Sequence, residues 1–341
     1  MLRKVQIFIS SLFYWLPIIR HNIVCRKNLL LPLYRRKNRE MAFEDGSDGQ
    51  KQIIYMVLKE TTFSGGLSDR LRAITAIYKQ CKQRNLPFRI VFEPLHLEDY
   101  LEHNLYDWRI KPQEVCYDTS KSYPCTLLTY HASTRDRYQQ FVQNTILREY
   151  LKKKYLQIHI YSNMICKDED YGALFKELFK PSLELQEQID YHLAQIGGDG
   201  TYISVTFRFR QLLGDFKEGG ETLPSSEREE YIHRCLHCIE RLHGVHPSEK
   251  ILVTADSSTF LQRVGDDMEM RKYVYLIPGE VVHIGFTFDA QKKTYMKSFV
   301  DYYMLSYAKC IYLVRDKKMY HSGFPYRAAL LNKREYREIK L

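Results

Sequence analysis

The first half of the chain reads as a strand, a glycine turn, a helix and a second strand. After a polar, glycine-bearing linker over 43–51, residues 53–58 (IIYMVL) form a short apolar run typical of a buried strand. Apolar residues then recur at helical spacing over 67–81, and residues 88–92 (FRIVF) predict the next strand. A unit of this kind starts a parallel sheet.

The second half of the chain alternates between predicted helices and strands. Helices are expected over 183–196, 226–244, 298–309 and 325–332, and strands over 202–209, 251–255, 273–277 and 310–314. Ser226 and Glu229 match a capping box at the start of the second of these helices, which Gly244 would close. Repeated β–α units predict a doubly wound domain. Residues 95–180 are harder to interpret, apart from a helix expected over 135–155.

Length and pattern together predict an α/β protein with two domains. A chain of 341 residues is long enough for two cores. We expect an apolar and basic N-terminal segment over 1–42, an α/β domain over 43–180 and a second α/β domain over 181–341.

The N-terminal segment leaves two interpretations open. Val5 to Ile19 is apolar and is flanked by basic residues, but it is shorter than the roughly 20 residues of a membrane-spanning helix. It also lacks a small-residue cleavage site, which argues against a signal peptide. The segment would either lie on an anionic membrane surface or pack as a helix on the body of the protein. We expect a cytoplasmic protein, peripheral on the membrane in the first case.

The charge and the cysteines narrow the choice of partners. A formal net charge of +10 favours anionic partners such as nucleotides or an anionic membrane, although it also fits a basic surface that keeps the protein in solution. No basic helix with interleaved aromatic residues is present, which argues against nucleic acid. The pair Cys235 and Cys238 lacks a second ligand pair, so a buried helix face is expected there and no metal site.

The first candidate site is the glycine turn at Gly65 and Gly66. Two glycines after a strand let backbone N–H groups approach a phosphate or a sugar closely. Ser68 would cap the following helix, with Asp69 and Arg70 at its mouth. The alternative is an ordinary turn between a strand and a helix.

The second candidate site is the strand that ends in Arg208 and Arg210. Because alternate residues of a strand share a face, both arginines are expected to point the same way as Ser204 and Thr206. Guanidinium groups match the oxygens of a diphosphate, and strand ends line the ligand crevice of doubly wound domains. The alternative is an edge strand whose arginines are solvated.

Two further candidate sites follow later strands. Asp256 and Ser257 come directly after the strand over 251–255, where a carboxylate can accept from ribose hydroxyls or base N–H groups. Ser322 and Gly323 precede the last helix, and with Arg327 they suit a phosphate. In both places a plain helix cap is the alternative.

These segments, taken together, resemble the fucosyltransferase superfamily, which includes α1,6-fucosyltransferases, nodulation fucosyltransferases, bacterial α1,2-fucosyltransferases and protein O-fucosyltransferases. GGLSDRL at 65–71 is similar to the family's glycine loop, VTFRF and LLGD within 205–215 to its arginine motif, and TADSS at 254–258 to its Asp-bearing segment. Residues 300–331 give the longest match, although Thr206 stands where the family usually has a histidine.

The resemblance implies a GT-B-like α/β architecture, in which two Rossmann-like domains face each other across a cleft. It also implies transfer of fucose from GDP-fucose with inversion, without a metal and without a cofactor. It implies that Arg208 binds the β-phosphate, that Asp256 and Ser257 bind the nucleoside, and that Ser322 and Gly323 hold phosphate. The turn formed by Gly65, Gly66, Leu67, Ser68, Asp69 and Arg70 would line the sugar cleft. Asp301 would be structural.

For the chemistry we expect Arg208 to stabilise the leaving diphosphate, with Arg210 or Arg327 assisting. Asp69 or Asp215 would deprotonate the acceptor hydroxyl. The acceptor would be a glycan or a lipid-linked glycan of polysaccharide biosynthesis. Residues 95–165 would shape the site that binds it. Two alternatives remain: a transferase that uses another nucleotide sugar, and a non-catalytic glycan- or membrane-binding protein with the same fold.

Overall fold

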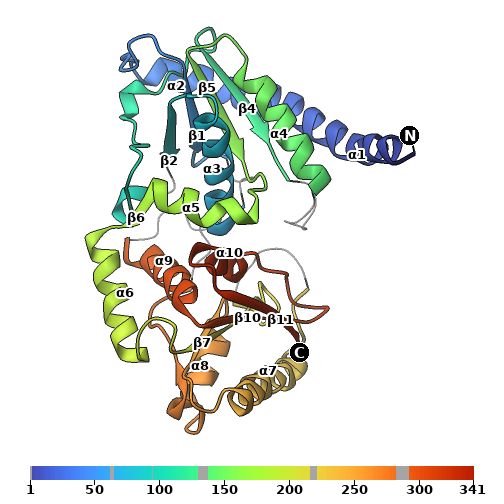
Figure 1. Ribbon diagram of the computed structural model, residues 1–341, viewed down its shortest axis with the longest axis vertical. Coiled ribbons are helices and arrows are strands. Elements are labelled where there is room, and N and C mark those ends of the chain that lie inside the picture. Colours follow the sequence, from blue (N-terminus) through green and yellow to red (C-terminus); the bar gives the residue numbers. More distant parts are fainter. Residues whose placement is uncertain (1, 62–64, 94, 130–136, 216–220, 282–291) are drawn as a thin grey trace. The chain divides into compact units, whose positions relative to one another are not determined.

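The structure, a computed structural model, describes residues 2–61, 65–93, 95–129, 137–215, 221–281 and 292–341 of the chain, with the backbone alone over 2–12 and 292–294. These residues divide into two compact units, Met1–Lys180 and Pro181–Leu341. Each unit carries a parallel sheet of its own (Figure 1). The expected α/β class with Rossmann-like domains is therefore confirmed.

The sheet of the first unit has four parallel strands in the order β2-β1-β5-β4. Apolar runs such as IIYMV give strands that are buried on both faces, which is typical of parallel sheets. The strands are β1 Gln52–Val57, β2 Phe88–Phe92, β4 Ser122–Leu127 and β5 Gln157–Ser162. The helices after the N-terminal segment are α3 Leu67–Lys82, α4 Arg137–Leu151 and α5 Asp168–Leu178. The short strands β3 Leu101–His103 and β6 Phe179–Pro181 pair separately.

The N-terminal segment is helical along its described length: α1 Leu2–Cys25, a π-helical stretch Arg26–Leu30, and α2 Leu31–Glu40. Leu33 and Tyr34 of α2 are buried in a core cluster with Ile54 and Met56 of β1. Figure 1 shows α1 beside β4 and α4, which it contacts. The prediction that this segment packs as a helix is thus confirmed for its buried residues, which include Leu33 and Tyr34. No helix in the described part of the chain combines the length and the apolar character needed to cross a bilayer.

The sheet of the second unit has five parallel strands in the order β11-β10-β7-β8-β9. In Figure 1, α7 and α8 lie on one face of it and α9 and α10 on the other. The strands are β7 Ile203–Phe207, β8 Ile251–Ala255, β9 Val274–Tyr275, β10 Cys310–Arg315 and β11 Glu335–Lys340. The helices are α6 Leu183–Ile196, α7 Ser225–Val245, α8 Ser258–Asp266, α9 Lys292–Tyr307 and α10 Phe324–Leu331.

Several boundaries differ from the sequence prediction. The capping box at Ser226 is wrong, because α7 begins one residue earlier and its N-cap is Pro224, with no side-chain cap. The same helix continues past Gly244 to Val245. The strand expected over 273–277 is reduced to the two residues of β9. Cys235 and Cys238 are buried on α7, as expected for a helix face.

Candidate functional site

The carboxyl ends of β7, β8 and β10 lie at one edge of the second sheet. β7 is the middle strand and pairs in parallel with both neighbours, so that Phe207 is opposite Ala255 and Thr206 is opposite Leu313. The alternative of an edge strand with solvated arginines is therefore wrong. The segments that follow these strands contain Arg208, Asp256 and Ser322, and open α/β sheets bind ligands at this edge.

Arg208 and Asp256 form an ion pair at this edge. A guanidinium nitrogen of Arg208 donates to Asp256 Oδ2, and the two side chains are 16% and 9% exposed. The same carboxylate accepts the backbone N–H of Phe209 at 2.6 Å and that of Arg210 at 2.7 Å. Asp256 therefore fixes both the side chain of Arg208 and the backbone that follows it.

Arg210 does not share the face of Arg208 in the way that strand alternation predicted. β7 ends at Phe207, and Arg210 has a φ of +55°, in the left-handed region that non-glycine residues seldom adopt. Its guanidinium lies over the ring of Tyr320 at 5.0 Å from the centroid. The backbone N–H of Tyr320 donates to the carbonyl of Arg208 at 3.1 Å. Tyr320, which sequence reasoning missed, thus joins the segment after β10 to the segment after β7.

Asp215 and Ser257 meet at the start of α8. Ser257 is the N-cap and its hydroxyl accepts the N–H of Phe260, so the helix-cap alternative is confirmed for this residue. Asp215 accepts from the hydroxyl of Ser257 at 2.5 Å and from the hydroxyl of Thr259 at 2.7 Å. A carboxylate at a helix N-terminus is favourably placed with respect to the helix dipole. The role of Asp215 as a base stays a prediction.

The segment after β10 places a glycine cap and a hydroxyl at the start of α10. Gly323 is the N-cap, and Ser322, which is buried, accepts the N–H of Phe324 at 3.3 Å. Arg327 is fully buried, with its guanidinium 5.4 Å from the ring centroid of Tyr326. The helix N-terminus thus faces the same edge as Arg208, whereas a direct phosphate contact of Arg327 stays a prediction.

The glycine turn of the first unit has the backbone that only glycine adopts readily. Gly65 has a φ of +77°, and a Cβ atom there would lie 2.6 Å from Asp69 Oδ2. Gly66 is the N-cap of α3, which begins at the buried Leu67. The prediction that Ser68 caps this helix is wrong, because Ser68 already lies inside the first turn.

The charged residues of this turn are paired with one another and with the backbone. Arg70 is fully buried, and its Nε donates to the carbonyl of Gly65 at 2.9 Å. Asp69 pairs with Arg72 at 2.9 Å and is 38% exposed. Arg72, which sequence reasoning did not assign to the site, also donates to the carbonyl of Asn163 at 2.6 Å. Arg70 therefore holds the turn in shape, whereas Asp69 is accessible to solvent.

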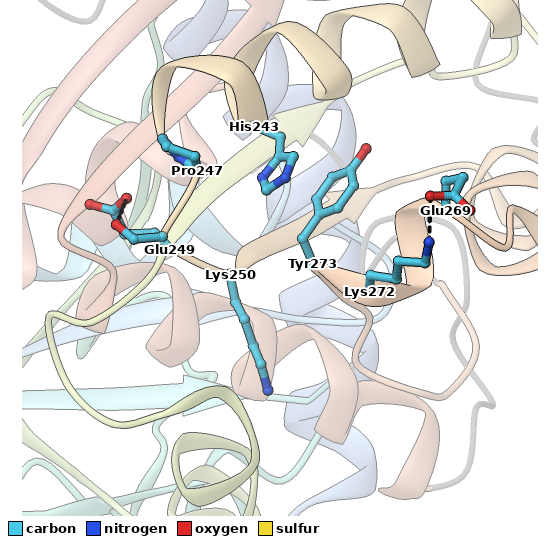
Figure 2. A pocket seen from close by; sticks show the side chains of 8 residues that line it. His243, Pro247, Glu249, Lys250, Glu269, Lys272 and Tyr273 are labelled. Carbon is cyan, nitrogen blue, oxygen red and sulfur yellow. Dashed lines mark hydrogen bonds and ion pairs between the residues drawn. The ribbon is translucent and has the colours of Figure 1, made fainter.

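A separate open pocket of about 380 Å³ lies at the amino end of β8, the opposite edge of the second sheet (Figure 2). The rings of His243 and Tyr273 stack in it, with centroids 3.8 Å apart. Lys272 pairs there with Glu269 at 2.6 Å. None of the predicted site residues lines this pocket. Within the part of the chain that the structure describes, no three histidine, cysteine or carboxylate side chains are arranged to hold a metal ion.

Comparison with known proteins finds likeness in structure only. No family model matches the sequence, and no curated protein matches it either. A mutant of Arabidopsis thaliana FUT1 in complex with GDP is 12% identical with a TM-score of 0.54, over 97% of this chain and 78% of that one. POFUT1 in complex with GDP is 11% identical with a TM-score of 0.51, over 86% of this chain and 98% of that one.

A NodZ alpha-1,6-fucosyltransferase soaked with GDP-fucose is 14% identical with a TM-score of 0.48, over 83% of this chain and 92% of that one. At identities this low the likeness concerns the fold and does not extend to activity. The match to FUT1 and POFUT1 shows that this chain shares the fold of those two structures, which is of the GT-B class.

Proposed function

We propose that the protein is a glycosyltransferase that moves fucose from GDP-fucose to a glycan acceptor, with inversion and without a metal. The FUT1 and POFUT1 structures that share its fold were obtained with GDP. The observation that carries the proposal is the position of Arg208, which follows the central strand of the second sheet and is held there by Asp256. The donor is a substrate, so no cofactor is needed.

Arg208 would act on the departing diphosphate. Negative charge grows on that group as the glycosidic bond breaks, and a positive group already aimed at it is usually the largest catalytic contribution. Because Asp256 already holds the guanidinium in place, Arg208 needs no reorganisation when the charge appears. Arg210 and Arg327 would assist from the same edge of the sheet. Asp256 would contribute through Arg208 in addition to its proposed contact with the nucleoside.

The remaining donor contacts would come from the helix starts. Amide groups at the first turn of a helix bind phosphate well. Helix α10 begins beside Ser322 and Gly323, at the same edge of the sheet as Arg208. Ser257, the cap of α8, would contact the nucleoside. In the first unit we propose that the turn at Gly65, Gly66, Leu67, Ser68 and Arg70 contacts the donor sugar.

Two carboxylates are candidates for the base, and Asp69 is the better one. Asp215 already accepts from two hydroxyl groups at the start of α8, which favours a capping role. The side chain of Asp69 is 38% exposed and pairs with the guanidinium of Arg72. A base must be within hydrogen-bond reach of the acceptor hydroxyl, which an accessible carboxylate can satisfy.

The proposal also covers the acceptor and the compartment. We infer a glycan or lipid-linked glycan of polysaccharide biosynthesis, bound by residues 43–180, with the donor bound by residues 181–341. All eight cysteines are buried and free of disulfides, which supports a reducing, cytoplasmic location.

Titration calorimetry with GDP, UDP and their sugar conjugates tests the proposal. GDP-selective binding together with hydrolysis of GDP-fucose is the expected result. Binding of UDP in preference to GDP would favour a transferase of a different sugar. Absence of binding to any nucleotide would overturn the proposal in favour of a non-catalytic glycan- or membrane-binding protein.

Replacing Arg208 tests the mechanism. Arg208→Ala should lower the turnover of GDP-fucose by about 100- to 1000-fold, the usual loss when one such charge-stabilising donor is removed. Arg334→Ala is the matched control, because this arginine pairs with Asp199 and precedes β11 at the opposite edge of the sheet. Unchanged turnover in a folded Arg208→Ala protein would remove Arg208 from the mechanism.

A further inference from the structure

Helix α1 has one buried face and one exposed apolar face. Over the residues whose side chains are described, Ile18, Asn22 and Cys25 are buried at helical spacing. Asn22 accepts the backbone N–H of Thr126 in β4 at 2.8 Å, which ties this face to the first sheet. The exposed apolar side chains of the helix lie on the side opposite to this buried face.

Helix α1 exposes more large apolar side chains than any other described helix. Phe13, Leu16 and Ile23 are 75%, 69% and 60% exposed, and their spacing of three and seven residues places them on one stripe. Ile19 and Val24 flank this stripe and are exposed as well. Contiguous apolar groups in water usually mark a binding surface, whereas single ones need no explanation. We call Phe13, Leu16, Ile19, Ile23 and Val24 the apolar stripe.

Positive charge accompanies the apolar stripe. Arg20 follows Phe13 by seven residues and is exposed on the same side of the helix. Lys27, Arg35 and Arg39 are exposed farther along, and the structure records no ion pair for these four among the residues it describes. The first 42 residues contain nine arginines and lysines against one acidic residue, Glu40. The partner of this face should therefore be both apolar and negatively charged.

We propose that the apolar stripe docks on the surface of an anionic lipid bilayer. The apolar side chains would enter the boundary between headgroups and acyl chains, while Arg20 and Lys27 reach lipid phosphates. The helix would lie in the interface, because its opposite face is buried against the first sheet. A second copy of the chain fits the face less well, because pairing two identical basic faces brings like charges together. The apolar stripe contains none of the residues that we propose for the transfer reaction.

Vesicle flotation tests the apolar stripe. The protein should float with vesicles of phosphatidylcholine and phosphatidylglycerol and remain behind with phosphatidylcholine alone. The variant Phe13→Ser, Leu16→Ser and Ile23→Ser should bind the anionic vesicles at least about tenfold more weakly. Its matched control is Leu105→Ser, Leu183→Ser and Val245→Ser, three comparably exposed apolar residues elsewhere, which should bind like the wild type. Circular dichroism and GDP binding should be unchanged in both.

The charge is tested separately. Arg20→Gln and Lys27→Gln should each weaken binding to anionic vesicles by about fivefold, the usual contribution of one basic residue near the surface. High salt should weaken it further. Equal binding of the wild type to both vesicle types would overturn the proposal. It would also be overturned if the stripe variant changed the molecular mass in sedimentation velocity while binding vesicles like the wild type, because the stripe would then be an interface between copies.

Discussion

The carboxylate of Asp256 receives the guanidinium of Arg208 and two backbone N–H groups from the segment after β7. Three such contacts on one side chain make it a positioning residue for Arg208. The aspartate is almost fully buried, so water cannot replace the lost partner if it is changed. A role in shaping the site is therefore separable from a role in contacting the donor.

The substitution Asp256→Asn should lower both stability and turnover. It keeps the shape but loses the negative charge, so hydrogen bonds to a charged group worth about 1.5–3 kcal/mol in total are weakened. We expect a decrease of this size in the free energy of unfolding in urea, and a fall in kcat for donor hydrolysis. Asp199→Asn is the control, because its ion pair with Arg334 is exposed and should contribute at most about 1 kcal/mol. A fall in GDP affinity with kcat unchanged would instead assign Asp256 to donor binding.

Gly65 and Gly49 form a matched pair for the glycine turn. Both have a positive φ, +77° and +74°, but a Cβ atom at Gly49 would meet nothing within 4 Å. Gly49→Ala should therefore cost only the backbone strain, about 1–2 kcal/mol. Gly65→Ala should cost more, because Asp69 must move away and release Arg72. Thermal unfolding measures the difference, and only Gly65→Ala should reduce transfer activity. Equal costs would show that Asp69 does not constrain the turn.

At the scale of elements, the strands that were predicted are those whose side chains are mostly apolar. β1, β2 and β8 follow the predicted ranges within one residue, since continuous apolar runs are typical of strands covered on both faces. The strands β4 and β5 are equally buried but were missed. β5 reads QIHIYS, and its polar residues are satisfied by partners that no local pattern indicates. Gln157 accepts the N–H of Cys116, and His159 bonds Tyr34.

In the candidate site, too, the local pattern predicted where residues lie but did not predict their partners. The positions of Arg208, Asp256 and Ser322 after strands could be predicted, because strands of one parallel sheet end at the same edge. Their partners could not. The pairing of Arg208 with Asp256 and the contact of Arg210 with Tyr320 join segments that are far apart in the sequence. Such contacts depend on strand order, which the periodicity of a single strand does not contain.

The buried histidine of β5 predicts how stability depends on pH. Burial lowers the pKa of His159 to about 3, against about 6.5 in an unfolded chain. Between these values the unfolded state binds a proton that the folded state does not, so stability is full above pH about 6.5 and falls as the pH is lowered. The loss should approach about 1.4 kcal/mol for each pH unit.

Urea unfolding between pH about 7.5 and about 5 measures this loss. His159→Gln removes the titrating ring and should give a shallower dependence on pH, although it also weakens the bond to Tyr34 and lowers stability at neutral pH. His237→Gln is the control, because it makes the same substitution at an exposed histidine on α7. An identical slope in the wild type and the His159→Gln variant would contradict the assignment.

At the scale of the whole molecule, each unit has its own sheet, and the predicted donor contacts are divided between them. The turn at Gly65 belongs to the first unit, and Arg208, Asp256 and Ser322 belong to the second. Hydrogen–deuterium exchange reports on each segment independently, so it can ask which of them a donor reaches. GDP should slow exchange over 208–215, 255–260 and 320–327, because a bound diphosphate adds hydrogen bonds to the segment after β7 and to the starts of α8 and α10.

GDP-fucose should slow exchange over the same segments and, in addition, over 65–72, because we assign that turn to the sugar. The pocket residues 243–250 supply an internal control, since they lie at the opposite edge of the second sheet and should exchange at the same rate with and without nucleotide. Protection over 243–250 and none over 208–215 would place the nucleotide at the wrong edge. Protection over 208–215 with no change over 65–72 for either ligand would leave the nucleotide site standing and remove the glycine turn from the donor site.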